Sequence, residues 1–241
     1  MTPNVTHVTD VTHASTPWQR QILPRVSRLW WLKTIGTIAI LVLFFAAYLH
    51  VLKHPASPPV TVPMLLIDDW IGFFPPALWV YASLWVYLSL APSWLLGLRE
   101  LLAFGIWITL LCCAGLLIFY FWPTQVTLSV VDHAQHWGFA TLRGVDAGGN
   151  ACPSLHVATA VFTFYWFDRV IRDMNMGMPG RFGNALWLIA IAWSTMAIKQ
   201  HVAIDVAAGF ALGTLFAAAS LWGRRLVSWA DYQQARQARQ H

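Results

Sequence analysis

The chain has 241 residues, of which 58% are hydrophobic and only 10% are charged. This composition excludes an ordinary soluble domain and indicates a protein that crosses a membrane several times. The formal net charge of +5 is explained below by orientation in the membrane, so it gives no reason to expect a nucleic-acid partner.

The sequence divides into one membrane domain with a tail at each end. Residues 1–28 lack a usable periodicity and are predicted to form a flexible tail, residues 29–223 form the membrane domain, and residues 224–241 form a basic polar tail. Six apolar stretches can be compared with the ~20 residues that a bilayer core requires: about Trp30–Leu52, Gly72–Leu90, Leu101–Trp122, Leu155–Phe167, Asn184–Ile198 and Val202–Trp222. The predicted fold is all-α, an integral membrane bundle of six transmembrane helices.

The basic residues predict the orientation of this bundle. If the residues before Trp30 are cytoplasmic, 12 of the 15 Lys and Arg residues lie on the cytoplasmic side, and only Lys53, Arg143 and Lys199 lie outside. This asymmetry follows the positive-inside rule and places both termini in the cytoplasm. The compact chain suggests a bacterial inner membrane, with the opposite face toward the periplasm.

One polar island precedes the sixth stretch, where Lys199-Gln200-His201 is followed by Asp205. His201 and Asp205 are four residues apart, so a helix places them on one face, where the carboxylate can orient the imidazole. Such a pair serves a histidine nucleophile or base. The alternative is a buried pair that only holds helices together.

A second polar island, Pro153-Ser154-Leu155-His156, opens the fourth stretch. Ser154 is a natural N-cap residue, and unpaired amides at a helix N-terminus favour phosphate. The topology places His156 and His201 at one depth near the outer face. Two histidines beside such amides and Lys199 indicate phosphoryl transfer without a metal or other cofactor.

These motifs resemble the type 2 phosphatidic acid phosphatase superfamily, whose second and third motifs read Pro-Ser-Gly-His and Ser-Arg, five residues, His, three residues, Asp. The second motif matches residues 153–156, with Leu155 in place of Gly. The third matches Ser194-Thr195, His201 and Asp205, with Thr195 in place of Arg. The Pro-Ser-Leu-His form and residues 122–124, Trp-Pro-Thr, are most similar to the inositol phosphorylceramide synthase branch.

The resemblance implies a role for each matched residue. His201 would be the nucleophile that forms a phosphohistidine, His156 the general acid, Asp205 the residue that orients His201, and Ser154 a phosphate ligand. The superfamily's first motif, a Lys followed by Arg-Pro, is missing, since no basic residue occurs between Arg99 and Arg143.

Three further residues are therefore assigned to substrate binding. Lys199 is the first candidate for the missing cation, with Arg143 as a substitute, and Thr195 occupies the position of the motif arginine.

The expected substrate is a phospholipid or lipid phosphate. The fourth and fifth stretches have only about 13 and 15 apolar residues, short of a full span, which predicts a site sunk below the headgroups. The leading function is a metal-independent lipid phosphatase or phosphotransferase at the outer membrane face. The alternatives are an inactive lipid-binding scaffold, or a cytochrome with His156 and His201 as haem ligands; the oligomeric state stays open.

Overall fold

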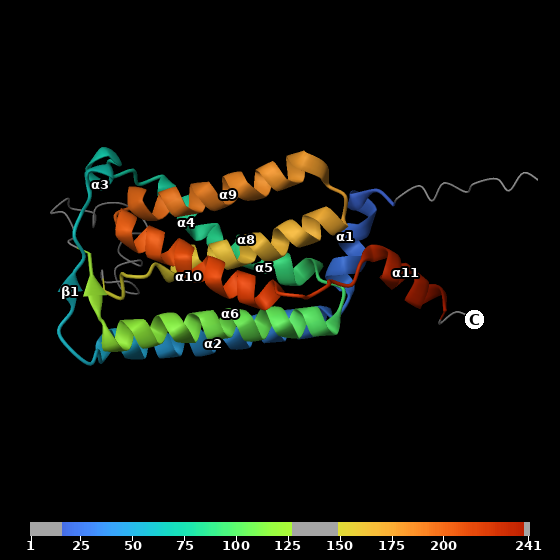
Figure 1. Cartoon of the computed structure of the whole chain (residues 1–241), viewed down its shortest axis with the longest axis horizontal. Helices are drawn as coiled ribbons and strands as arrows, with labels where there is room; N and C mark the ends of the chain where they lie inside the picture. Colours follow the sequence, from blue (N-terminus) through green and yellow to red (C-terminus); the bar gives the residue numbers. More distant parts are fainter. Residues whose placement is uncertain (1–15, 127–148, 239–241) are drawn as a thin grey trace, which may run out of the picture.

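The computed structural model describes residues 16–126 and 149–238. Almost all regular structure in these residues is helical (Figure 1). The elements are α1 (Trp18–Ser27), α2 (Trp30–Lys53), β1 (Val60–Thr61), α3 (Leu66–Trp70), α4 (Ala77–Ala82), α5 (Leu84–Trp94), α6 (Leu98–Phe121), β2 (Thr124–Gln125), α8 (Leu155–Asp173), α9 (Gly177–Ala197), α10 (Ala203–Leu221) and α11 (Trp229–Gln237).

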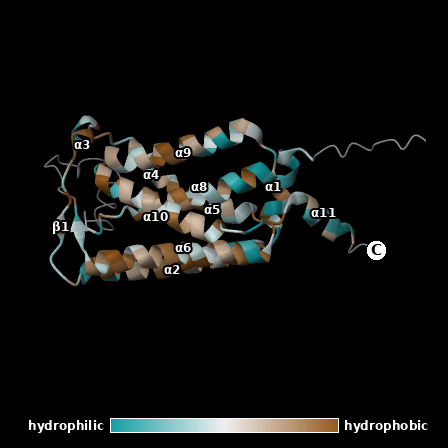
Figure 2. Ribbon diagram, viewed as in Figure 1, coloured by the Kyte–Doolittle hydropathy of each residue, from teal (hydrophilic) through white to brown (hydrophobic). Residues whose placement is uncertain are grey.

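The long helices run side by side and form an elongated bundle (Figure 1). Helix α8 is its central element and packs against α5, α6, α9 and α10, whereas α2 packs mainly against α6. Helices α1 and α11 lie at one end, and α3 lies at the other end with β1 and β2, which form a two-stranded parallel sheet. Figure 2 shows apolar residues along the bundle and polar ones gathered near α1 and α11.

Within the described residues, three helices are long and apolar enough to cross a membrane: α2, α6 and α10, with 24, 24 and 19 residues. This supports the prediction of a mainly helical membrane protein, with the short β1–β2 sheet as the departure from an all-α fold. The count of six spans stays a prediction. The second predicted span is two short helices, α4 and α5, which meet at Ser83.

The fourth and fifth predicted spans are longer in the structure than their apolar stretches suggested. Helix α8 has 19 residues and α9 has 21, so each continues through polar sequence. The charge of Asp168 is compensated by ion pairs with Arg172 and Arg181, which makes it tolerable near the helix ends. The shortness of the apolar stretches therefore does not mean short helices.

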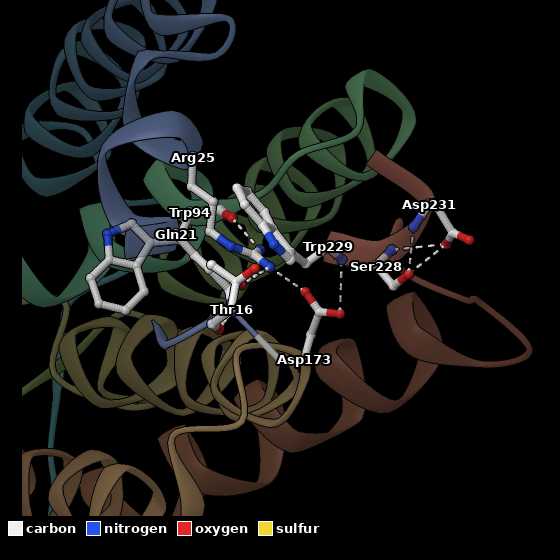
Figure 3. Close-up of polar contacts among 8 residues, drawn as sticks. All are labelled: Thr16, Gln21, Arg25, Trp94, Asp173, Ser228, Trp229 and Asp231. Atoms are coloured by element: carbon white, nitrogen blue, oxygen red, sulfur yellow. Dashed lines mark hydrogen bonds and ion pairs between the residues drawn. The ribbon is translucent and has the colours of Figure 1, made fainter. Parts of the chain in front are cut away.

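The predicted flexible tail ends earlier than residue 28, because Trp18–Ser27 forms helix α1. Its Arg25 is only 1% exposed, forms an ion pair with Asp173 at the end of α8 and donates to the Trp94 carbonyl oxygen (Figure 3). The guanidinium also lies over the Trp229 ring of α11. A buried arginine needs such partners, and these tie α1 to three other helices.

Glycines allow α8 and α10 to approach closely. A Cβ added to Gly209 would lie 2.5 Å from the backbone oxygen of Ser154, and one added to Gly213 would lie 2.4 Å from that of Ala158. Glycines four residues apart form a flat strip on one helix face, a common device at helix contacts in membranes. This contact sets the spacing between the beginnings of the two helices.

Candidate active site

The two polar islands meet at the α3 end of the bundle. His156 lies in the first turn of α8, and His201 lies two residues before α10 begins. The backbone N–H of Ser154 donates to the Asp205 carbonyl oxygen at 3.0 Å. This bond joins the two motifs directly, because each lies at the start of one of two closely packed helices.

Asp205 is fully buried and serves two neighbours at once. Its Oδ2 accepts a hydrogen bond from the Val202 N–H at 3.0 Å and lies 3.5 Å from Nδ1 of His201. The first contact caps helix α10, and the second favours a proton on Nδ1 of the imidazole. The other ring nitrogen, Nε2, then keeps its lone pair.

His156 is held from one side by Tyr81 of α4. The two rings are stacked with centroids 3.8 Å apart and planes 14° apart. Its Nε2 is buried without a hydrogen-bond partner among the described residues. A ring fixed in this way presents one nitrogen for proton transfer.

Ser154 and Thr195 use their side chains locally. The Ser154 hydroxyl accepts from the Val157 N–H at 3.3 Å and caps α8, as its sequence position predicts. The Thr195 hydroxyl donates to the Ala192 carbonyl oxygen within its own helix, and its carbonyl oxygen accepts from the backbone N–H of His201. Thr195 thus supports the turn that carries His201.

Lys199 is anchored to backbone near α3. Its Nζ donates to the carbonyl oxygens of Asp68, at 2.8 Å, and Ile71, at 2.5 Å, so the ammonium group fastens the α9–α10 turn in this structure. Arg143, the other candidate cation, lies outside the described residues. A direct role for either residue at phosphate stays a prediction.

Asp68 is a supporting residue that the motifs did not reveal. Its Oδ1 accepts from the Ala203 N–H at 2.7 Å, at the start of α10, and its Oδ2 accepts from the Leu65 N–H at 2.8 Å. One buried carboxylate thus caps α3 and α10. The contact spans 135 positions, so no local pattern could indicate it.

A large apolar cavity adjoins the two histidines. It has a volume of about 740 Å³ and extends between α2, α4, α5 and α6, with His156, His201 and Asn150 among its lining residues. A second apolar cavity of about 490 Å³ shares Ile40, Leu41, Trp85, Leu88 and Ile108 with it and reaches Lys33. Apolar walls with few polar groups suit an amphiphile whose headgroup meets the histidines.

Cys152 lies beside the same carboxylate but is a poor competing nucleophile. Burial and the Asp205 charge raise the pKa of the Cys152 thiol to about 11. Since the thiolate is the reactive form, a thiol with this pKa stays protonated and unreactive at neutral pH. The imidazoles are therefore the candidate nucleophiles at this end of the bundle.

One comparison with known proteins shows the family of the chain. Residues 68–219, more than half of the sequence, match the family model described as the PAP2 superfamily. The match begins at Asp68 and contains both histidine motifs, and it gives no evidence for the inositol phosphorylceramide synthase branch. No curated protein and no solved structure matches the chain.

Proposed function

Since the chain belongs to the PAP2 superfamily, we propose that it is an integral membrane enzyme that removes or transfers a phosphoryl-containing group of a lipid phosphate or phospholipid. The observation that supports this most strongly is the position of His156 and His201 on one apolar cavity. A lipid tail would occupy the apolar part, and the phosphate would lie at the polar end.

In the proposed reaction, Nε2 of His201 attacks phosphorus while Asp205 stabilises the proton on Nδ1. The bond from phosphorus to the leaving oxygen breaks, and His156 gives that oxygen its proton. An acceptor hydroxyl then attacks the phosphohistidine and passes its proton to His156, which restores the free enzyme. The amides at the start of α8, capped by Ser154, would stabilise the oxygens around phosphorus.

We further propose the six-span arrangement with both termini in the cytoplasm. The site would then face the periplasm, because α1 and α11 lie at the end of the bundle opposite α3 (Figure 1). The charge distribution supports this orientation, as the predicted external segments contain only Lys53, Arg143 and Lys199.

Transfer to a lipid or polyol hydroxyl is the second candidate outcome of the same chemistry. His201 is only 7% exposed, and Leu155, which is buried as well, lines the same cavity, so water has restricted access to the phosphohistidine. Leu155 fits there because it packs over Gly115, where a Cβ would come within 2.4 Å of Leu155 Cδ2. This favours an acceptor hydroxyl on a lipid, which can enter through the apolar cavity, as in the inositolphosphotransferase-like branch.

The test is release of phosphate or headgroup from lipid phosphates and phospholipids by protein purified in detergent, with and without hydroxyl acceptors. We expect turnover by the wild type that a chelator does not reduce, and loss of turnover in His201→Ala. His156→Ala should lower kcat by about 10²- to 10⁴-fold, the usual contribution of general acid catalysis. Radiolabelled substrate should label wild-type protein and not His201→Ala.

His54→Ala is the matched control, because His54 is exposed just after α2 and stacks on His50. It should keep full turnover. If the wild type turned over no substrate in the panel, the proposed enzymatic function would be refuted and the inactive scaffold favoured. A Soret band in the purified protein would favour the cytochrome hypothesis.

A further inference from the structure

Asn150 lines the same cavity as His156 and His201. It precedes the Pro153–His156 motif, is 5% exposed, and its Nδ2 has no hydrogen-bond partner among the described residues. A buried amide donor without a partner is costly, so such a group in a binding cavity indicates a ligand that accepts from it.

Backbone contacts on both sides of Asn150 hold this part of the chain in place. Gly149 pairs with Gln125 of β2 as an isolated bridge, and the Ala151 N–H donates to the Thr124 carbonyl oxygen at 3.2 Å. Asn150 itself has φ 56°, in the left-handed region, which asparagine tolerates better than most residues. The backbone position of the amide is therefore fixed on both sides.

The described lining of the cavity offers the phosphate no cation. Its described lining residues include no Lys or Arg, and the Lys199 ammonium group is bound to two carbonyl oxygens. The sequence also has no basic residue between Arg99 and Arg143, where the bases of the superfamily's first motif are expected. An amide N–H from Asn150 would supply a donor where a cation is missing.

We propose that Asn150 is a substrate-binding residue whose side-chain amide donates to a non-bridging oxygen of the lipid-borne phosphate. The proposal rests on the proposed phosphatase or phosphotransferase function. The amide of Asn150 then adds to the contacts proposed above: Nε2 of His201 at phosphorus, His156 at the leaving oxygen, and the amides at the start of α8. The amide would bind the charged headgroup and contribute nothing to recognition of the tail.

The test compares Asn150→Gly, which tolerates the left-handed backbone and removes the amide, with Asn150→Asp, which keeps the shape and replaces the donor with a negative acceptor. We expect kcat/KM to fall roughly 10- to 100-fold in Asn150→Gly, as for loss of a hydrogen bond to a charged group, and further in Asn150→Asp. Inhibition by orthovanadate, a phosphate mimic, should weaken in parallel. Inhibition by the lipid alcohol with the same tail should not change.

Asn175 provides the matched control, since it has φ 55° and is exposed in the turn between α8 and α9. Asn175→Gly and Asn175→Asp should stay within about twofold of the wild type in all three measurements. The proposal is overturned if both Asn150 variants keep wild-type kcat/KM and vanadate inhibition. It is equally overturned if inhibition by the lipid alcohol weakens as much as inhibition by vanadate, which would mean a structural role. Failure of the wild type to turn over any substrate would instead refute the proposed function.

Discussion

At the residue scale, buried carboxylates position the candidate catalytic groups by capping helices. Asp205 and Asp68 accept from consecutive backbone N–H groups at the start of α10, those of Val202 and Ala203. Negative charge at a helix N-terminus is stabilising, and each hydrogen bond satisfies a donor that the helix leaves unpaired. The turn that carries His201 therefore depends on a residue from the distant α3 segment.

Replacement of Asp68 tests this dependence. Asp68→Ala removes the acceptors for Ala203 and Leu65, and we expect unfolding free energy to fall by about 1–2 kcal/mol, as for loss of a helix cap. Turnover should fall as well, because His201 loses its fixed position. Asp68→Asn should be milder, since its oxygen can still accept from one of these N–H groups. Thermal unfolding in detergent and the lipid assay measure the two effects.

Asp69 supplies the comparison, because it is the adjacent acidic residue and is exposed. Asp69→Ala should change unfolding free energy by less than about 0.5 kcal/mol. Equal losses of unfolding free energy in the Asp68 and Asp69 variants would show that the negative charge of the segment stabilises the fold, and that the two hydrogen bonds of Asp68 do not.

At the scale of elements, the distance between α8 and α10 determines whether the two histidine motifs can act together. The Gly209 and Gly213 positions leave no room for a methyl group, because the opposing atoms are backbone oxygens of α8 that cannot rotate away. Gly209→Ala should therefore push the helix starts apart. We expect a loss of about 1–3 kcal/mol in stability, typical of overpacking, and a larger relative loss of turnover than of folded protein.

Gly183 in α9 provides the opposite case, because a Cβ there would meet nothing within 4 Å. Gly183→Ala should leave turnover unchanged and stabilise the helix by roughly 0.5–1 kcal/mol, since glycine is unfavourable inside helices. If Gly209→Ala behaved like Gly183→Ala in unfolding and turnover, the close contact between α8 and α10 would not be what positions the motifs.

At the scale of the whole molecule, the sequence predicted what local spacing encodes. The N-cap Ser154 has the local contact expected of it. Asp205 lies 3.5 Å from Nδ1 of His201, but His201 precedes α10 and the two do not share a helix face as the spacing predicted. Contacts between distant segments were not predictable: those of Asp68 with α10, and the fixing of Asn150 against β2. The length of the apolar stretch also underestimated the length of α8, because hydropathy cannot reveal the ion pairs that compensate the charge of Asp168.

The orientation of the whole bundle in the membrane can be measured from the positions of its ends. Helices α1 and α11 lie at one end and α3 at the other (Figure 1). Reporters fused to the two termini should therefore report the same side of the membrane. A reporter inserted near Pro58, in the segment between α2 and α3, should report the opposite side. The positive-inside rule predicts cytoplasmic termini. Reporter fusions that are active only in the cytoplasm or only in the periplasm measure this, with lipid turnover as the check on folding. Periplasmic termini would place His156 and His201 at the cytoplasmic face and would require the substrate to come from the inner leaflet.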